Sequence, residues 1–150
     1  MKGFKFRYER ILKQREDAEE EVKTKLGKVN HILQSLLSEK ATVLAQQNHL
    51  FDSIQERLSG GIRTSDLRMF EQSKHHFKSK IESLESEIVD AQLKIIQVKK
   101  ELTEAVKQRK IMEKLKEKEF EAYNEALNAA ENKVIEEIVN YKSSQKSGDS

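Results

Sequence analysis

The chain has 150 residues with no cysteine, no proline, no tryptophan and five glycines, and 36% of its residues are charged. This composition suits long helices and excludes a disulfide framework and thiol chemistry. Because aromatic residues make up only 6% of the chain, we expect one elongated coiled-coil domain rather than a compact core covered on all sides. The net charge of +2 is no reason by itself to expect a nucleic-acid or membrane partner.

The amino-terminal residues contain no apolar run of the kind that forms a signal sequence. No segment approaches the roughly 18 apolar residues of a membrane-spanning helix. We therefore expect a soluble cytoplasmic protein.

Apolar residues alternate at spacings of three and four, which predicts a coiled-coil helix over about 4–58. The a and d positions of this repeat are Tyr8, Leu12, Val22, Leu26, Val29, Leu33, Leu36, Val43, Leu50 and Ile54. Polar residues interrupt it at Arg15, Glu19, Lys40 and Gln47. A second apolar stripe occupies e positions, at Leu37, Leu44, Phe51 and Leu58. Side packing and a docking site are equally good explanations of that stripe.

Adjacent glycines, Gly60 and Gly61, predict a turn over 59–64, because glycine ends helices and tolerates positive φ. The heptad pattern then resumes from Leu67 and predicts a second helix over about 65–142. The polar residues 143–150 are expected to be a disordered tail.

A turn this short predicts that the two helices are antiparallel in an all-α coiled-coil hairpin. Folding the chain about Ile62 places Leu26 opposite Val98 and Leu33 opposite Ala91, so that each a position meets a d position. The alternative is a parallel homodimer in which the glycines form a kink.

The second helix is longer than the first, so the hairpin has a carboxy-terminal overhang. Residue 121 lies opposite residue 3, and from there to about 142 no partner is expected within the chain. The overhang carries an apolar stripe, for which we expect a heterologous partner, the alternative being that it frays or self-associates. Its members are Phe120, Tyr123, Leu127, Ala130, Val134, Ile138 and Tyr141.

Two basic segments converge in this hairpin: residues 1–15 (+5) and residues 107–118 (+4). A solvated surface and docking on an acidic protein explain this charge equally well. Acidic residues interrupt the patch and no nucleic-acid reading motif is present, so we expect no nucleic-acid partner. Arg15 and Arg109 fall in one layer of the hairpin, which requires acidic neighbours such as Glu16, Glu19 or Glu113.

The sequence offers no phosphate-binding loop, no cysteine nucleophile and no metal-ligand spacing. The four histidines are best explained as surface residues. We expect no catalytic residues, no metal, no cofactor and no enzyme activity.

The amino terminus resembles the FliJ family of bacterial flagellar export proteins, in which Phe-x-Phe precedes Leu-x-x-Arg-Glu and an acidic stretch. The matching residues are Phe4, Phe6, Tyr8, Leu12, Arg15 and Glu16. A second match lies in the carboxy-terminal half, at Arg109, Glu113, Lys114, Leu115, Lys116, Glu117 and Tyr123.

The resemblance implies a non-enzymatic stalk, similar to the central stalk of rotary ATPases, at the cytoplasmic face of the inner membrane. The end with both termini would enter the hexameric ring of the flagellar export ATPase, and the turn half would contact the membrane export gate. Export chaperones would be escorted, and membrane association would occur through partners alone. The implied ATPase-binding residues are Tyr8, Leu12, Arg15, Arg109, Lys114, Lys116, Phe120 and Tyr123. The implied gate-binding residues are Gln47, Leu50, Phe51 and Phe70.

Two alternatives stay open on the sequence alone. One is the equivalent stalk of a virulence-type secretion system. The other is a generic coiled-coil scaffold that forms homodimers through residues 120–141.

Overall fold

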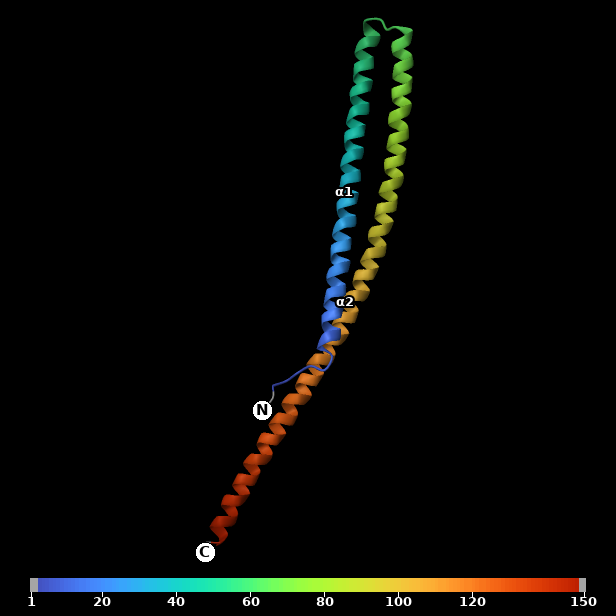
Figure 1. Ribbon diagram of the computed structural model, residues 1–150. Helices are drawn as coiled ribbons and strands as arrows, with labels where there is room; N and C mark the ends of the chain where they lie inside the picture. The colour runs from blue at the N-terminus through green and yellow to red at the C-terminus, as the bar shows by residue number, and fades with distance from the viewer. Residues whose placement is uncertain (1–2, 149–150) are drawn as a thin grey trace. The chain divides into compact units, whose positions relative to one another are not determined.

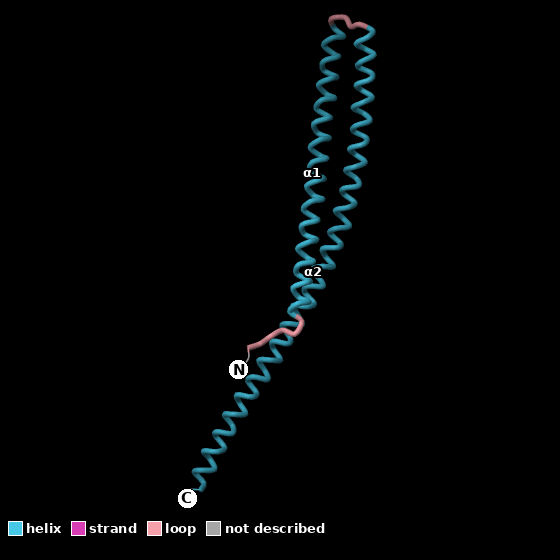
Figure 2. Tube along the Cα trace, viewed as in Figure 1, coloured by secondary structure: helices cyan, strands magenta, loops and turns pink. Residues whose placement is uncertain are grey.

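The computed structural model describes residues 3–148. Helix α1 covers Glu9–Ser59 and helix α2 covers Thr64–Gly148, and the described residues contain no strand. Loop is confined to segment 3–8 and to the turn between the helices, as Figure 2 shows. The chain divides into two compact units. Glu20–Thr103 is here called the turn unit, and Met1–Glu19 with Glu104–Ser150 the terminal unit.

In the turn unit, α1 and α2 lie side by side and antiparallel, joined by the short turn (Figure 1). Val98 is fully buried against Val29 and Ile95, and Leu26 is packed on the same cluster, as the folding about Ile62 requires. All the buried hydrophobic residues of this unit occupy predicted a and d positions: Val29, Val43, Ile54, Leu84, Ile88, Ala91, Ile95 and Val98. The predicted helical hairpin is confirmed, and the parallel homodimer with a glycine kink differs from this fold.

Ion pairs between the helices agree with this register. Lys25 Nζ lies 3.1 Å from Glu101 Oε2, and Lys40 Nζ lies 3.3 Å from Glu85 Oε1. Lys40 interrupts the apolar pattern at an a position, and its ion pair with α2 explains how the interface accommodates it. These partly exposed pairs add little stability, so burial of the apolar layers holds the unit together.

The turn is built as the adjacent glycines predict. Helix α1 ends at Ser59, and Gly61 has a φ of 86°, which a residue with a Cβ atom adopts only with strain. The carbonyl of Arg63 then accepts hydrogen bonds from the N–H groups of Asp66 and Leu67 to begin α2. Leu67, expected in the core, is instead 41% exposed, because the residue opposite it on α1 is Arg57 rather than an apolar partner.

The helix ends in the terminal unit differ from the sequence-based boundaries. Helix α1 begins at Glu9 rather than near residue 4, and segment 3–8 is irregular. Helix α2 continues past residue 142 to Gly148, so 143–148 are helical where a disordered tail was expected, and 149–150 lie outside the described residues. Helical hydrogen bonding favours continuation, since the segment contains no proline to interrupt it.

No helix within residues 3–148 combines the length and the apolar character needed to cross a membrane. The same residues contain no group of three or more His, Cys, Asp or Glu side chains placed to hold a metal ion.

Candidate partner-binding sites

The terminal unit contains a charge cluster centred on the buried carboxylate of Glu19. The Glu19 side chain is only 6% exposed, and its carboxylate accepts a hydrogen bond from Arg109 Nε. Arg109 Nη1 donates a second bond to Glu113 Oε1 at 2.7 Å. The hydrogen bond to Glu113, and after it the one to Glu19, raises the pKa of the Arg109 guanidinium above its ordinary value. Like any arginine, Arg109 is charged at every working pH, so the cluster always holds this cation.

This cluster shows how the hairpin accommodates Arg15 and Arg109, which the sequence places in one layer. Arg109 is held between Glu19 and Glu113, two of the acidic neighbours that the layer required, while Arg15 is exposed. Because a buried carboxylate is costly without its partner, this pair disfavours other registers of the two helices. We infer that Arg109 and Glu19 have a structural role in positioning the helices.

Segment 3–8 packs against α2 beyond the start of α1. The Phe4 ring lies 5.2 Å from the Phe120 ring in an edge arrangement and 5.6 Å from the Tyr123 ring. Phe6 is buried, and its ring lies 5.9 Å from that of Tyr8. Alternate residues of a non-helical chain can share one side, which explains the Phe-x-Phe spacing. Helix α2 thus has a partner in its own chain as far as Tyr123, which corrects the expectation of no partner from residue 121 onward.

Two ion pairs add to this arrangement. Lys116 Nζ lies 3.0 Å from a Glu9 carboxylate oxygen, and Arg7 lies 4.0 Å from Glu119. Glu9 is in the first turn of α1, where a negative charge is favourable to the helix dipole. These contacts fix segment 3–8 and the first turn of α1 on α2.

Beyond Leu127, helix α2 is exposed on all sides in the described part of the chain. Every side chain from 128 to 148 is exposed. Five large side chains of this stretch are at least half exposed: Val134, Ile135, Ile138, Val139 and Tyr141. An isolated helix gains little from propensity alone, so this surface is suited to binding another protein.

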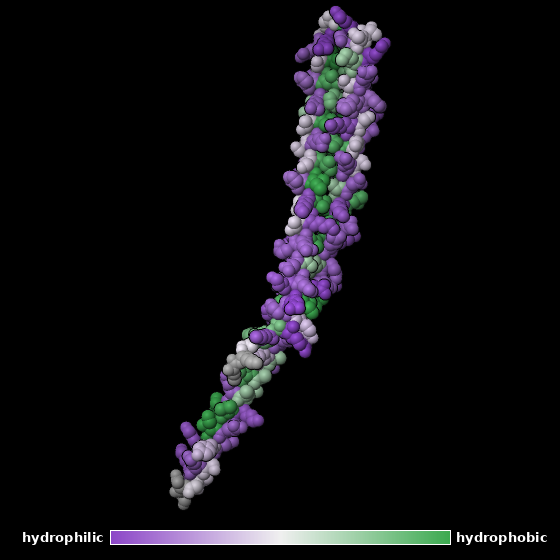
Figure 3. Space-filling view, in the orientation of Figure 1, coloured by the Kyte–Doolittle hydropathy of each residue, from purple (hydrophilic) through white to green (hydrophobic). Residues whose placement is uncertain are grey.

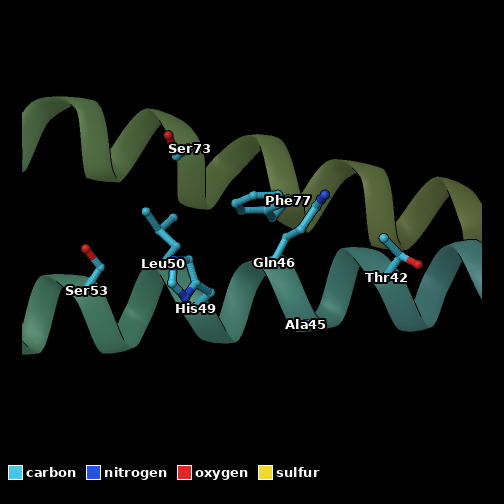
Figure 4. Close-up of a pocket in the computed structure, with 8 residues that line it drawn as sticks. All are labelled: Thr42, Ala45, Gln46, His49, Leu50, Ser53, Ser73 and Phe77. Carbon is cyan, nitrogen blue, oxygen red and sulfur yellow. The ribbon is translucent and has the colours of Figure 1, made fainter.

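The turn unit carries a separate, open groove between its two helices. Figure 4 shows Leu50 of α1 and Phe77 of α2 extending into the space between the ribbons. The groove is lined by Thr42, Ala45, Gln46, His49, Leu50 and Ser53 from α1 and by Ser73 and Phe77 from α2. Because its lining combines apolar side chains with uncharged polar residues and a histidine, it can hold an apolar side chain of a partner protein.

A family model described as "Flagellar FliJ protein" matches residues 4–148, nearly the whole chain. The chain belongs to the FliJ family. Searches of curated proteins and of solved structures find no match. FliJ membership makes the chain a component of the flagellar protein export apparatus and favours the flagellar assignment over a virulence-type system. The family is non-catalytic.

The eight residues that the resemblance implies for ATPase binding fall into three groups in the structure. Leu12 is 4% exposed, Arg109 is held by two carboxylates, and Lys116 is paired with Glu9, so these three stabilise the unit. Arg15 and Lys114 are exposed, and no ion pair is present for either among the described residues. The aromatic residues Tyr8, Phe120 and Tyr123 are intermediate or exposed, and all three contact segment 3–8 or belong to it.

The four residues that the resemblance implies for binding the export gate do not form one cluster in the turn unit. Leu50 lines the groove, and Gln47 is half-buried at an a position. The Phe51 ring lies 5.7 Å from the Phe70 ring, edge to face, and Phe51 is not one of the groove-lining residues. The groove therefore contains one of the four candidates.

Sequence reasoning missed several contributors to these sites. The packing of Phe4 on Phe120 and Tyr123 of α2 does not follow from the family resemblance, although the i, i+2 spacing of Phe4 and Phe6 is a usable signal for a non-helical segment. Glu19 is one of several acidic neighbours that the arginine layer requires, and the sequence alone does not single it out as the buried carboxylate that pairs with Arg109. His49 is exposed, as predicted for the histidines, but its place in the lining of the groove is visible only in the structure.

Proposed function

We propose that this FliJ-family chain is a non-enzymatic stalk whose terminal unit binds the ring of the flagellar export ATPase and promotes its assembly and activity. The supporting observation is the division of the basic side chains in this unit. Arg7, Arg109 and Lys116 are used in ion pairs within the unit. Of the other described cations of this unit, those between residues 5 and 118 are exposed at the end that carries both basic segments, and they are available to an acidic partner surface: Lys5, Arg10, Lys13, Arg15, Lys107, Lys110, Lys114 and Lys118.

A surface of one sign speeds association with an oppositely charged partner, and the effect weakens as salt screens it. The exposed apolar stripe beyond Leu127 is in contact with water, and its burial by a partner would lower the free energy of the complex. Together these features suit a protein that is steered by charge to its partner and held there by apolar contact.

The test is the hydrolysis rate and the binding affinity of the purified export ATPase with and without this chain. The double variant Arg15→Glu/Lys114→Glu should weaken the apparent affinity by about tenfold or more at low salt, and by less at high salt. Lys78→Glu/Lys100→Glu is the matched control, since it reverses two exposed lysines of the turn unit. If the wild-type chain neither binds the ATPase nor changes its rate at low salt, or if both double variants behave alike, the proposal fails.

We further propose that the turn unit contacts the membrane export gate through the groove around Leu50 and that export chaperones are bound as well. Gln47, Phe51 and Phe70 stay hypotheses in this role. The variant His49→Glu adds a charge at the groove without touching the core and should weaken binding of the gate's cytoplasmic domain. His75→Glu is the control at an exposed site outside the groove. Equal binding by both variants would remove the groove from the proposal.

In this scheme the protein acts at the cytoplasmic face of the inner membrane through its partners. Neither a cofactor nor nucleic acid has a part in it.

A further inference from the structure

The outer face of α1 in the turn unit carries a second line of residues at coiled-coil spacing, separate from the a and d core. These residues alternate at spacings of three and four along the b and e positions: Gln34, Leu37, Ala41, Leu44, Asn48, Phe51, Gln55 and Leu58. All eight are exposed. We call this line the outer seam. It extends over more than three heptads, or about 35 Å at ~1.5 Å per residue, which is long enough to sustain a coiled coil.

The outer seam contains no charged residue, although 36% of the chain is charged. Earlier on α1, the b and e positions carry Lys13, Glu16, Glu20 and Lys23. On α2, the corresponding positions of the turn unit include Glu71, Lys78 and Glu82. A helix face that only contacts water gains solubility from charge, so the loss of charge along this one line indicates that something covers it.

The outer seam is continuous with the interface between α1 and α2. Phe51 of the seam packs against Phe70, which is a d residue of that interface. Leu37, Leu44, Phe51 and Leu58 are 40%, 37%, 40% and 54% exposed, so each retains apolar surface that α2 does not cover. Figure 3 shows hydrophobic surface along the visible face of this unit. Apolar residues at a, d and e together are the pattern of helices that pack in a bundle of more than two.

We propose that the outer seam binds the outer seam of a second copy of this chain, antiparallel about a two-fold axis, so that two turn units form a four-helix bundle. An antiparallel pair places each b residue opposite an e residue, as a opposes d in the hairpin itself. Leu44 then meets Asn48 of the second copy, and Ala41 meets Phe51. Because large residues face small or amide residues and no charge enters the layers, the seam is complementary to itself.

A second copy suits this surface better than a charged partner does. The covering surface must be uncharged and must repeat at the same spacing over the same length, and the outer seam satisfies both conditions. With four half-exposed large side chains per copy, we expect an interface in the weak class, below about 1,200 Å² of buried surface. The dimer should therefore form reversibly as protein concentration rises. This inference does not depend on the proposed binding to export components, because it concerns the purified chain alone.

The experiment is sedimentation velocity of the full chain over a concentration series, with circular dichroism to verify folding. The wild type should shift from monomer to dimer. Leu44→Lys should raise the dimer dissociation constant at least about tenfold, because it buries a charge without a partner. Leu93→Lys is the matched control on α2, 60% exposed and outside the seam, and should leave dimerisation unchanged. Asn48→Lys, at an exposed polar position, should act like Leu44→Lys even if the latter variant folds poorly.

Orientation is tested with disulfides, since the natural chain has no cysteine. A mixture of Leu44→Cys and Asn48→Cys chains should form the mixed disulfide in preference to either like pair. A parallel dimer would instead favour like pairs.

Besides a preference for like disulfide pairs, which would contradict the antiparallel arrangement, three results would overturn the proposal. The first is a monomer throughout the concentration series. The second is a dimer that Leu44→Lys and Asn48→Lys both leave intact. The third is a dimer abolished by Ile138→Lys alone, which would place self-association on the carboxy-terminal part of α2 instead.

Discussion

The burial of Val98 predicts a large difference between two identical substitutions on one helix. Val98 is fully buried in the cluster with Val29 and Ile95, whereas Val89, on the outer face of α2, is 52% exposed. Val98→Ala removes two buried carbon atoms at about 0.8 kcal/mol each. A cavity of roughly 50 Å³ at ~24 cal/mol per Å³ adds up to about 1.2 kcal/mol if the neighbours do not move. The better helix propensity of alanine returns about 0.5 kcal/mol. The expected net loss is therefore about 1–2.5 kcal/mol.

For Val89→Ala the loss of contact is small and the propensity gain is the same, so we expect a change within about 0.5 kcal/mol. The assay is urea denaturation followed by circular dichroism at 222 nm, with the slope m compared between variants. A shift of the midpoint at constant m measures the change in stability. Equal midpoints for the two variants would show that the Val98 layer does not hold the helices together, and the register would have to be reconsidered.

Four further predictions concern the interior of α1, the turn, the charge cluster and the amino-terminal segment. Gly27→Ala should raise the free energy of unfolding by about 1 kcal/mol in urea denaturation, because the added Cβ meets open space within α1. Gly61→Ala should lower it by about 1 kcal/mol or more, since φ there is positive, and a stabilising effect would contradict the turn geometry. Glu19→Gln should lower the thermal midpoint by roughly 3 °C or more relative to the exposed control Glu20→Gln, because it leaves the Arg109 guanidinium without its buried carboxylate. Equal midpoints for the two variants would argue against a structural role of the cluster. Phe4→Ala should speed tryptic cleavage within segment 3–8, and Phe4→Leu should speed it by a smaller factor. An unchanged rate of cleavage would mean that the ring contacts do not fix the segment.

Much of the fold could be predicted from the sequence because its determinants are local or periodic. The alternation of apolar residues at three and four positions places Val29, Ile95 and Val98 on facing sides of two helices. Gly61 at the turn then brings these residues to the same level. The resemblance at both ends of the chain identified the family for a similar reason, since its motifs are short runs of neighbouring residues.

Helix ends were less predictable, because they depend on contacts between residues far apart in the sequence. Residues near Phe4 could continue α1, but the non-helical path lets Phe4 reach Phe120 and Tyr123. At the other end, α2 continues through 143–148 because helical hydrogen bonds satisfy the backbone there.

The sequence by itself determined the helices, the turn and the register, because hydrophobic periodicity and one glycine pair specify all three. The tertiary structure alone decided which basic residues are available to a partner. Arg15 and Arg109 have the same side chain and the same predicted layer, yet Arg109 is held by Glu19 and Glu113 while Arg15 faces solvent. The physical reason is that burying a charge costs the least free energy where an oppositely charged group is already in place. Only the packed helices show which carboxylate lies beside which arginine.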